Sequence, residues 1–263
     1  MAVVELHGRD EIAAFFGCNP RAHAYELGDL DDFDWLHTRW YGWQDDSGAL
    51  TQIVLLYSQP DVPVFIAIAE EPTATMEALV TSIVPLLPSP LYVHASPHLI
   101  PVLERRFSIA QAEPHVKLAL NHPERLPSKA ASVEILTAAD VPEIESFYRL
   151  AYPGTWFSPR MLGTERYVGI RQAGLLACVA GVHVYSPTWR VAALGNVATL
   201  PEYRGRGLAQ SACASLCLML LDDGIETIAL NVRSDNSAAI AAYAHLGFEH
   251  AASYVEASLV AHP

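Results

Sequence analysis

The sequence is poor in basic residues. Lys and Arg number 16 against 29 Asp and Glu in a chain of 263 residues, so the formal net charge is −13. A protein that binds duplex nucleic acid needs a basic surface that displaces counterions from the phosphates, and neither half of this chain has an excess of basic residues. We therefore expect no nucleic-acid partner.

Long apolar runs are also missing. No window holds about 18 or more uninterrupted apolar residues, the length that a membrane-spanning helix needs. The first residues, MAVVELHGRDEIAAFF, have neither the basic region nor the cleavage site of a secretory leader. We therefore predict a cytoplasmic protein with no membrane partner.

Cysteine is scarce, and its spacing indicates neither a disulfide framework nor a metal site. The four cysteines form no C-x-x-C pair, and the spacing of Cys213 and Cys217 is typical of two small core residues on one helix face. His94 and His98 have the same spacing, but Pro97 interrupts any helix that would align them. We predict no metal.

The composition, 51% hydrophobic, and the length indicate one large domain or two modest ones. Residues 122–131, HPERLPSKAA, are polar and hold two prolines, which predicts a boundary between domains 1–126 and 132–263. Each half has the order helix, strand meander, helix, strand, helix, strand. The second half illustrates it, with strands expected at 167–171, 174–185 and 189–199, a helix at 208–221, a strand at 228–232, a helix at 236–246 and a strand at 248–259. We predict an α/β (α+β) fold that is present twice.

One segment carries a chemical signal. The predicted strand ending at Thr199 runs into a loop that contains Gly205 and Gly207, and an apolar helix follows. A helix N-terminus presents unpaired N–H groups and the positive end of the helix dipole, and glycines let a ligand approach the backbone. Arg204 and Arg206 add positive charge. The segment therefore predicts a phosphate or pyrophosphate cradle, with an ordinary solvated turn as the alternative.

Three types of phosphate loop were compared with this segment. No G-x-x-x-x-G-K-[ST] run exists, and a dinucleotide fingerprint would need a third glycine where Gln210 stands. The acetyl-CoA pattern [QR]-x-x-G-x-[GA] is satisfied by Arg204, Gly207 and Ala209. Downstream, residues 236–248 read NSAAIAAYAHLGF and match N-x-x-A-x-x-x-Y-x-x-x-G-F at every defined position.

The two motifs, in this order and separated by a strand, resemble the GCN5-related N-acetyltransferase (GNAT) superfamily. The resemblance implies two GNAT-like domains, each with a mixed, mostly antiparallel central sheet flanked by helices, and acetyl-CoA as the acyl donor. The strand backbone at Val197, Ala198 and Thr199 would bind the pantetheine arm. The loop amides would bind the pyrophosphate; they belong to Arg204, Gly205, Arg206, Gly207, Leu208 and Ala209.

The resemblance also assigns roles to single residues. Asn236 is expected to cap a helix. The resemblance also implies that it contacts the cofactor, and a cap alone is the alternative. Tyr243 would protonate the departing CoA thiolate, although a tyrosine packed between helix and sheet is the alternative. Many members of the superfamily use a glutamate base on the strand before the loop, where this chain has Asn196. Asn196 and His183 are candidate substrate-binding residues, and the base stays open between His183, Glu202, a water chain and an amine that is already neutral.

The first half has no acetyl-CoA motif. Tandem members of the superfamily, including those that resemble glycine N-acyltransferases, keep a diverged N-terminal copy that shapes the acceptor pocket, and we interpret residues 1–126 in this way. The predicted function is transfer of an acetyl group from acetyl-CoA to a primary amine of a small molecule or peptide by direct attack. The alternative is a CoA-binding sensor or scaffold without catalysis.

Overall fold

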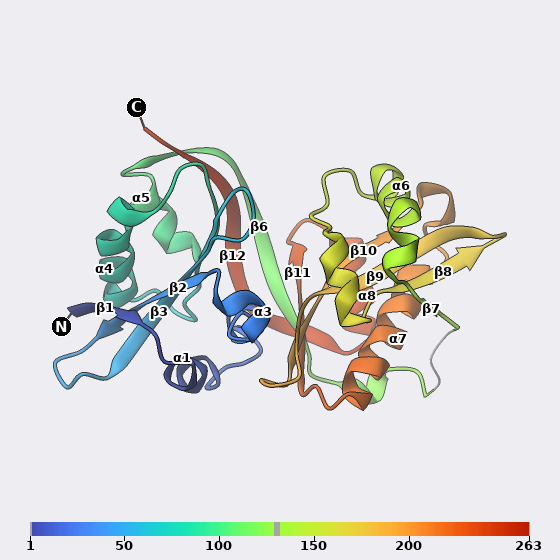
Figure 1. Cartoon of the computed structure of the whole chain (residues 1–263), viewed down its shortest axis with the longest axis horizontal. Helices are drawn as coiled ribbons and strands as arrows, with labels where there is room; N and C mark the ends of the chain where they lie inside the picture. The colour runs from blue at the N-terminus through green and yellow to red at the C-terminus, as the bar shows by residue number, and fades with distance from the viewer. Residues whose placement is uncertain (1, 129–131, 263) are drawn as a thin grey trace. The chain divides into compact units, whose positions relative to one another are not determined.

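A computed structural model describes residues 2–128 and 132–262, so the end of the predicted boundary segment, residues 129–131, lies outside the described residues. The chain forms two compact units. Unit 1 consists of residues 1–117, 232–235 and 251–263, and unit 2 consists of residues 118–231 and 236–250. Figure 1 shows helices beside the strands of each unit.

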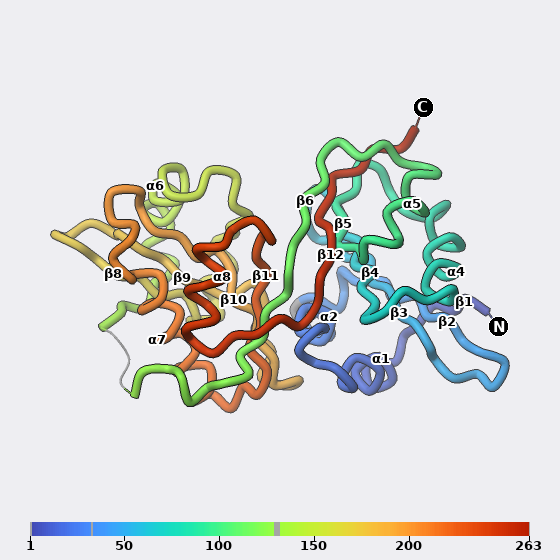
Figure 2. The backbone as a smooth tube through the Cα atoms, turned by 180° about the vertical axis from the view of Figure 1, so that it is seen from behind, coloured from blue at the N-terminus to red at the C-terminus, as the bar shows by residue number. Residues whose placement is uncertain are grey.

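Unit 1 is built on a mixed sheet with the strand order β1-β2-β3-β4-β5-β12-β6. Strands β2, β3 and β4 form an antiparallel meander, and β4 pairs in parallel with β5. Figure 2 shows β12 running beside β6. The elements are β1 (Ala2–Leu6), α1 (Arg9–Phe16), α2 (Ala24–Gly28), α3 (Asp32–Trp35), β2 (Thr38–Gln44), β3 (Leu50–Tyr57), β4 (Val64–Ala67), α4 (Ala74–Ile83), β5 (Leu91–Ala95), α5 (Ile100–Leu103), β6 (Phe107–Leu120) and β12 (Phe248–Ala261).

Unit 2 repeats this order of elements. Strands β8, β9 and β10 form the meander, α7 follows, and β10 pairs in parallel with β11. The strand order is β11-β10-β9-β8-β7, and the elements are β7 (Glu134–Ile135), α6 (Val141–Ala151), β8 (Val168–Gln172), β9 (Leu175–Ser186), β10 (Val191–Thr199), α7 (Leu208–Asp222), β11 (Thr227–Arg233) and α8 (Ser237–His245). The predicted fold class, a twofold mixed and mostly antiparallel α/β arrangement, is confirmed.

The two units do not coincide with the predicted domains 1–126 and 132–263. Residues 251–263 belong to unit 1, because β12 pairs with β5 from Val255 opposite Ala95 to Leu259 opposite Leu91. Unit 2 begins at residue 118, inside β6. The partner of a strand is set by contacts between segments far apart in the sequence. The polar segment 122–131 therefore could not reveal that residues 251–263 belong to unit 1.

The core of unit 2 places α7 against the sheet. Helix α7 packs on β8, β9 and β10, and Cys213 and Cys217 are buried in this packing, as their spacing predicts. Burial raises the pKa of the Cys217 thiol to about 12 and also raises that of Cys213. Both thiols are therefore protonated and unreactive at neutral pH.

Two kinds of feature are absent from residues 2–128 and 132–262. No helix in these ranges is long and apolar enough to cross a membrane. No group of three or more His, Cys, Asp or Glu side chains in them is arranged to hold a metal ion.

Unit 1 contains a buried ion pair. Lys117 on β6 is 1% exposed and donates to the carbonyl of Ala22 at 2.7 Å and to Glu26 Oε2 at 3.3 Å. Burial opposes ionisation of Glu26, but the charges of Lys117 and His23 outweigh it and lower the pKa of Glu26 to about 2. Glu26 therefore stabilises unit 1 above its ordinary pKa of 4.5 and loses this effect as the pH falls towards 2.

Replacing Lys117 by methionine is expected to lower the free energy of unfolding by about 3–5 kcal/mol, because it leaves a buried carboxylate without its opposite charge. Urea unfolding at pH 7 measures the loss. The control is Arg233→Met, which removes an exposed partner of Asp235 and should change the free energy by less than about 1 kcal/mol. Equal losses in the two variants would contradict the role assigned to Lys117.

Candidate active site

The loop between β10 and α7 leaves a row of backbone amides unused. Gly205 and Gly207 have φ of 74° and 76°, in the left-handed region that favours glycine, and a Cβ added at either would meet nothing within 4 Å. Gly207 is the N-cap of α7 and supplies no side-chain cap. No amide from Gly205 to Ala209 donates a well-formed hydrogen bond to a backbone carbonyl of the described chain. The loop thus has the open space and the donors that an anion requires.

Strands β10 and β11 separate immediately before this loop. Their parallel ladder joins Val191 to Thr227 and ends where Leu194 pairs with Leu230. Beyond Leu194, within the described residues, β10 pairs with β9 alone through Gly195, Ala198 and Thr199. The edge of β10 that faced β11 is therefore left for another hydrogen-bonding partner.

The two arginines of the loop bond to backbone carbonyls rather than to carboxylates. Arg204 donates to the carbonyls of Thr199 and Ala151, at 3.1 and 3.0 Å, and so ties the end of β10 to the end of α6. Arg206 donates to the carbonyl of Glu202 at 3.0 Å and lies over the ring of Tyr203. Neither guanidinium pairs with a carboxylate in the described part of the chain, so both raise the local potential at the loop.

Helix α8 carries the second motif. The side chain of Asn236 accepts a hydrogen bond from the amide of Ala239 at 3.2 Å, which confirms the predicted N-cap. Tyr243 is half-buried, and its ring meets Phe248 edge-on at 5.7 Å. Gly247 ends the helix with φ of 99°, and a Cβ there would lie 2.2 Å from the carbonyl oxygen of His122. Only glycine fits this position.

Asn196 lies at a β-bulge of β10 and is the centre of a hydrogen-bond network. Its φ is 54°, and it is 5% exposed. The side-chain nitrogen donates to the carbonyl of Trp156 at 3.0 Å and to the hydroxyl of Tyr167 at 2.9 Å. The side-chain oxygen accepts from Thr155 Oγ1 at 2.8 Å and lies 3.0 Å from His183 Nε2. Both polar atoms of the Asn196 side chain are thus hydrogen-bonded to groups of unit 2.

This network joins the segment after α6 to the bulge. The hydroxyl of Tyr148 on α6 donates to the backbone carbonyl of Asn196 at 2.7 Å. Burial raises the pKa of Tyr148 and of Tyr167, so both phenols stay neutral near pH 7. Sequence patterns do not bring Tyr148, Thr155 and Tyr167 to Asn196, although a Gly-Asn pair inside a strand is itself a bulge signal. Glu202, the other candidate base, is exposed in a single turn of helix after β10.

Unit 1 lacks the corresponding opening. Where β4 and β5 end, the amide of Ser96 donates to the carbonyl of Ala67, and Ser96 Oγ accepts from the amide of Ala69, both at 2.9 Å. The following segment carries Glu70 and Glu71, and Thr73 caps α4 by accepting from the amide of Met76. The strands are joined, the loop is acidic and the helix end is capped, so this loop does not suit an anion.

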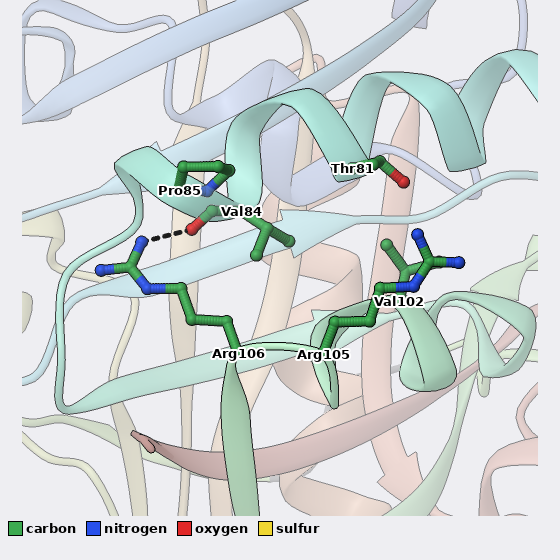
Figure 3. A pocket seen from close by; sticks show the side chains of 6 residues that line it. All are labelled: Thr81, Val84, Pro85, Val102, Arg105 and Arg106. Carbon is green, nitrogen blue, oxygen red and sulfur yellow. Dashed lines mark hydrogen bonds between the residues drawn. The ribbon is translucent and has the colours of Figure 1, made fainter. Parts of the chain in front are cut away.

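Unit 1 does contain a cavity of about 400 Å³ (Figure 3). Arg105 and Arg106 reach it, and Arg106 donates to the carbonyl of Val84 at the end of α4. The remaining lining residues are Thr81, Pro85 and Val102. The cavity contains no residue of either motif.

Comparisons with known proteins identify the class that this fold and loop define. Residues 138–248 match the acetyltransferase (GNAT) family. The [ribosomal protein bS18]-alanine N-acetyltransferases of Salmonella typhimurium and Escherichia coli K12 are each 31% identical over 124 residues, which is 46% of this chain and 82% of theirs. The chain belongs to the GNAT family and is an N-acetyltransferase.

Solved structures extend the likeness in fold to both units. A tandem GNAT protein from the clavulanic acid biosynthesis pathway aligns with 100% of this chain and 99% of its own, at a TM-score of 0.56 and 17% identity. A Drosophila protein aligns over 98% of both chains, at a TM-score of 0.71 and 14% identity. These identities support a shared tandem fold only. The likeness to glycine N-acyltransferases stays a prediction.

Proposed function

We propose that the protein transfers the acetyl group of acetyl-CoA to a primary amine, with the donor bound in unit 2. The observation that carries this proposal is the open row of amides from Gly205 to Ala209 at the N-terminus of α7, beside two unpaired guanidinium charges. The amides of this row, with Arg204 and Arg206, would hold the pyrophosphate. The free edge of β10 at Val197, Ala198 and Thr199 would hold the pantetheine arm.

The chemical step is direct attack of the amine on the thioester carbonyl. The C–N bond forms, the C–S bond breaks, and a backbone N–H of β10 stabilises the charge that develops on the carbonyl oxygen. Tyr243 protonates the departing thiolate. Asn236, besides capping α8, lies in the motif that would contact the cofactor. Asn196 is a positioning residue, because its side chain is already engaged by protein groups.

For the acceptor we propose an α-amine at the start of a peptide. The two bacterial relatives are named for acetylating an alanine of a ribosomal protein, and the acidic chain attracts cationic amines. Unit 1 is proposed as a diverged copy that does not bind the donor, since its own loop is closed and acidic. The four free cysteines favour a reducing compartment such as the cytoplasm.

Thiol release in the presence of acetyl-CoA tests the proposal. We expect turnover with a peptide that begins with alanine, and no turnover with the same peptide after its α-amine is blocked. Lysine, spermidine and glucosamine serve as alternative amines. Turnover with one of these alone would replace the peptide as acceptor, and thiol release equal to the amine-free background with every amine would refute the enzymatic assignment.

A further inference from the structure

His183 on β9 lies directly over the backbone of β10. A Cβ added to Gly195 would lie 2.3 Å from the Cδ2 atom of the His183 ring, so glycine at this position makes room for the imidazole. The ring of Trp156, which is 46% exposed, meets the His183 ring edge-on at 5.9 Å. The imidazole therefore sits where β10 leaves β11, next to the proposed pantetheine strand.

The hydrogen-bond network around Asn196 fixes the tautomer of His183. A backbone carbonyl can only accept, so the atom of Asn196 that faces the carbonyl of Trp156 is the side-chain nitrogen. The side-chain oxygen then faces His183 Nε2, at 3.0 Å. An amide oxygen only accepts, so Nε2 carries the proton, and the basic nitrogen of the neutral ring is Nδ1.

The side-chain oxygen of Asn231, on the same face of the sheet as Gly195, lacks a hydrogen-bond donor. Ala193 pairs with Ala229 in the β10–β11 ladder, so strand alternation places Gly195 and Asn231 on one face of the sheet. Asn231 lies one residue beyond the end of the ladder, and its side-chain oxygen is buried without a hydrogen-bond partner in the described chain. A buried acceptor left in this state points to an N–H group of a ligand.

We propose that His183 is the general base of the transfer and that Asn196 is its positioning residue. Nδ1 of His183 takes the proton of the acceptor nitrogen as the C–N bond forms, and Asn231 accepts the remaining N–H. The proton for the CoA sulfur comes from Tyr243. The step leaves His183 protonated and Tyr243 deprotonated, and proton exchange with water returns both to their starting states, so the proton count balances over one turnover. This inference rests on the proposed function, since it concerns the amine that the enzyme acetylates. The titratable side chains joined to His183 through Asn196 are Tyr148 and Tyr167, both neutral near pH 7.

The variant His183→Gln tests the base. Glutamine retains a side-chain N–H for Asn196, so the network and the fold are preserved. With the alanine peptide at pH 7 we expect kcat to fall by about 100-fold or more, the range of general-base catalysis, with acetyl-CoA affinity unchanged. The deficit should shrink as the pH rises, because hydroxide then takes over the removal of the proton that the attacking nitrogen loses. His7→Gln, an exposed histidine of unit 1, is the matched control.

Nitrogen NMR of the wild-type imidazole supplies a readout other than activity. In its neutral form, the imidazole of His183 should show a protonated Nε2 and an unprotonated Nδ1, and Asn196→Ala should shift this balance and lower kcat. A protonated Nδ1, or a His183→Gln enzyme with wild-type kcat and pH profile, would overturn the role of His183 as general base and leave the proposed acetyl transfer standing. Absence of turnover by the wild-type protein with every amine would instead overturn the proposed function and the base together.

Discussion

Replacing Tyr243 by phenylalanine is expected to lower kcat by about 10²–10⁴-fold, because the thiolate then leaves without a proton donor. The phenylalanine ring keeps the edge-on contact with Phe248, so the fold of α8 and the affinity for acetyl-CoA should be retained. Stopped-flow thiol release measures kcat, and calorimetric titration measures the affinity for acetyl-CoA. The split between turnover and binding is the signature of a group that acts on the reacting atoms.

The control for this variant is Tyr185→Phe. Tyr185 lies on β9 of the same unit and donates to Asp223 at 3.2 Å, outside both motifs. The Tyr185→Phe variant should have a kcat within about twofold of the wild-type value, as expected for a change away from the reacting atoms. Wild-type turnover in Tyr243→Phe would mean that Tyr243 does not donate the proton and that another group or water protonates the sulfur.

Reversing the charge of Arg206 is expected to weaken acetyl-CoA binding by about 10–100-fold, since a charge-assisted contact contributes about 1.5–3 kcal/mol. In Arg206→Glu a carboxylate stands beside the amides that would receive the pyrophosphate. The wild-type guanidinium is held only by a backbone carbonyl and the Tyr203 ring, so its loss breaks no ion pair. Calorimetric titration with acetyl-CoA measures the change.

A second charge reversal separates a local contact from the effect of net charge. Arg125→Glu makes the same change in an exposed residue of unit 2, and it should leave the affinity within about twofold at physiological salt, where distant exposed charges are screened. If both variants bind acetyl-CoA equally well, the pyrophosphate does not lie at residues 204–209.

Elements with a clear local pattern were predictable from the sequence. The helix expected at 208–221 is α7, Leu208–Asp222, and the strand expected at 228–232 is β11, Thr227–Arg233. Two features were missed. β1, Ala2–Leu6, is short, and the first half of β6, which begins at Phe107, is mostly polar and exposed, so neither shows a strong apolar alternation. Strand pairing between distant segments overrides such local signals.

The same division applies to the candidate site. The amide row at 205–209 and the cap at Asn236 follow from contiguous motifs, and the structure places both at helix N-termini, whereas the amide of Arg204 donates to the carbonyl of Pro201. The environment of His183 and Asn196 depends on Thr155, Trp156 and Tyr167, which come from separate segments. Hydrogen-bond partners of this kind have no spacing rule, so only the folded chain identifies the orientation of the imidazole.

Hydrogen exchange on the full chain, with and without acetyl-CoA, tests the central claim most directly. We expect acetyl-CoA to slow amide exchange at residues 197–199 and 205–209 of unit 2. We expect no change at the equivalent segment of unit 1, residues 67–76, where the amides of Ala69 and Met76 already donate to Ser96 and Thr73. Protection at 67–76 in place of 197–209, or unchanged exchange in both segments at saturating acetyl-CoA, would contradict binding of the donor in unit 2.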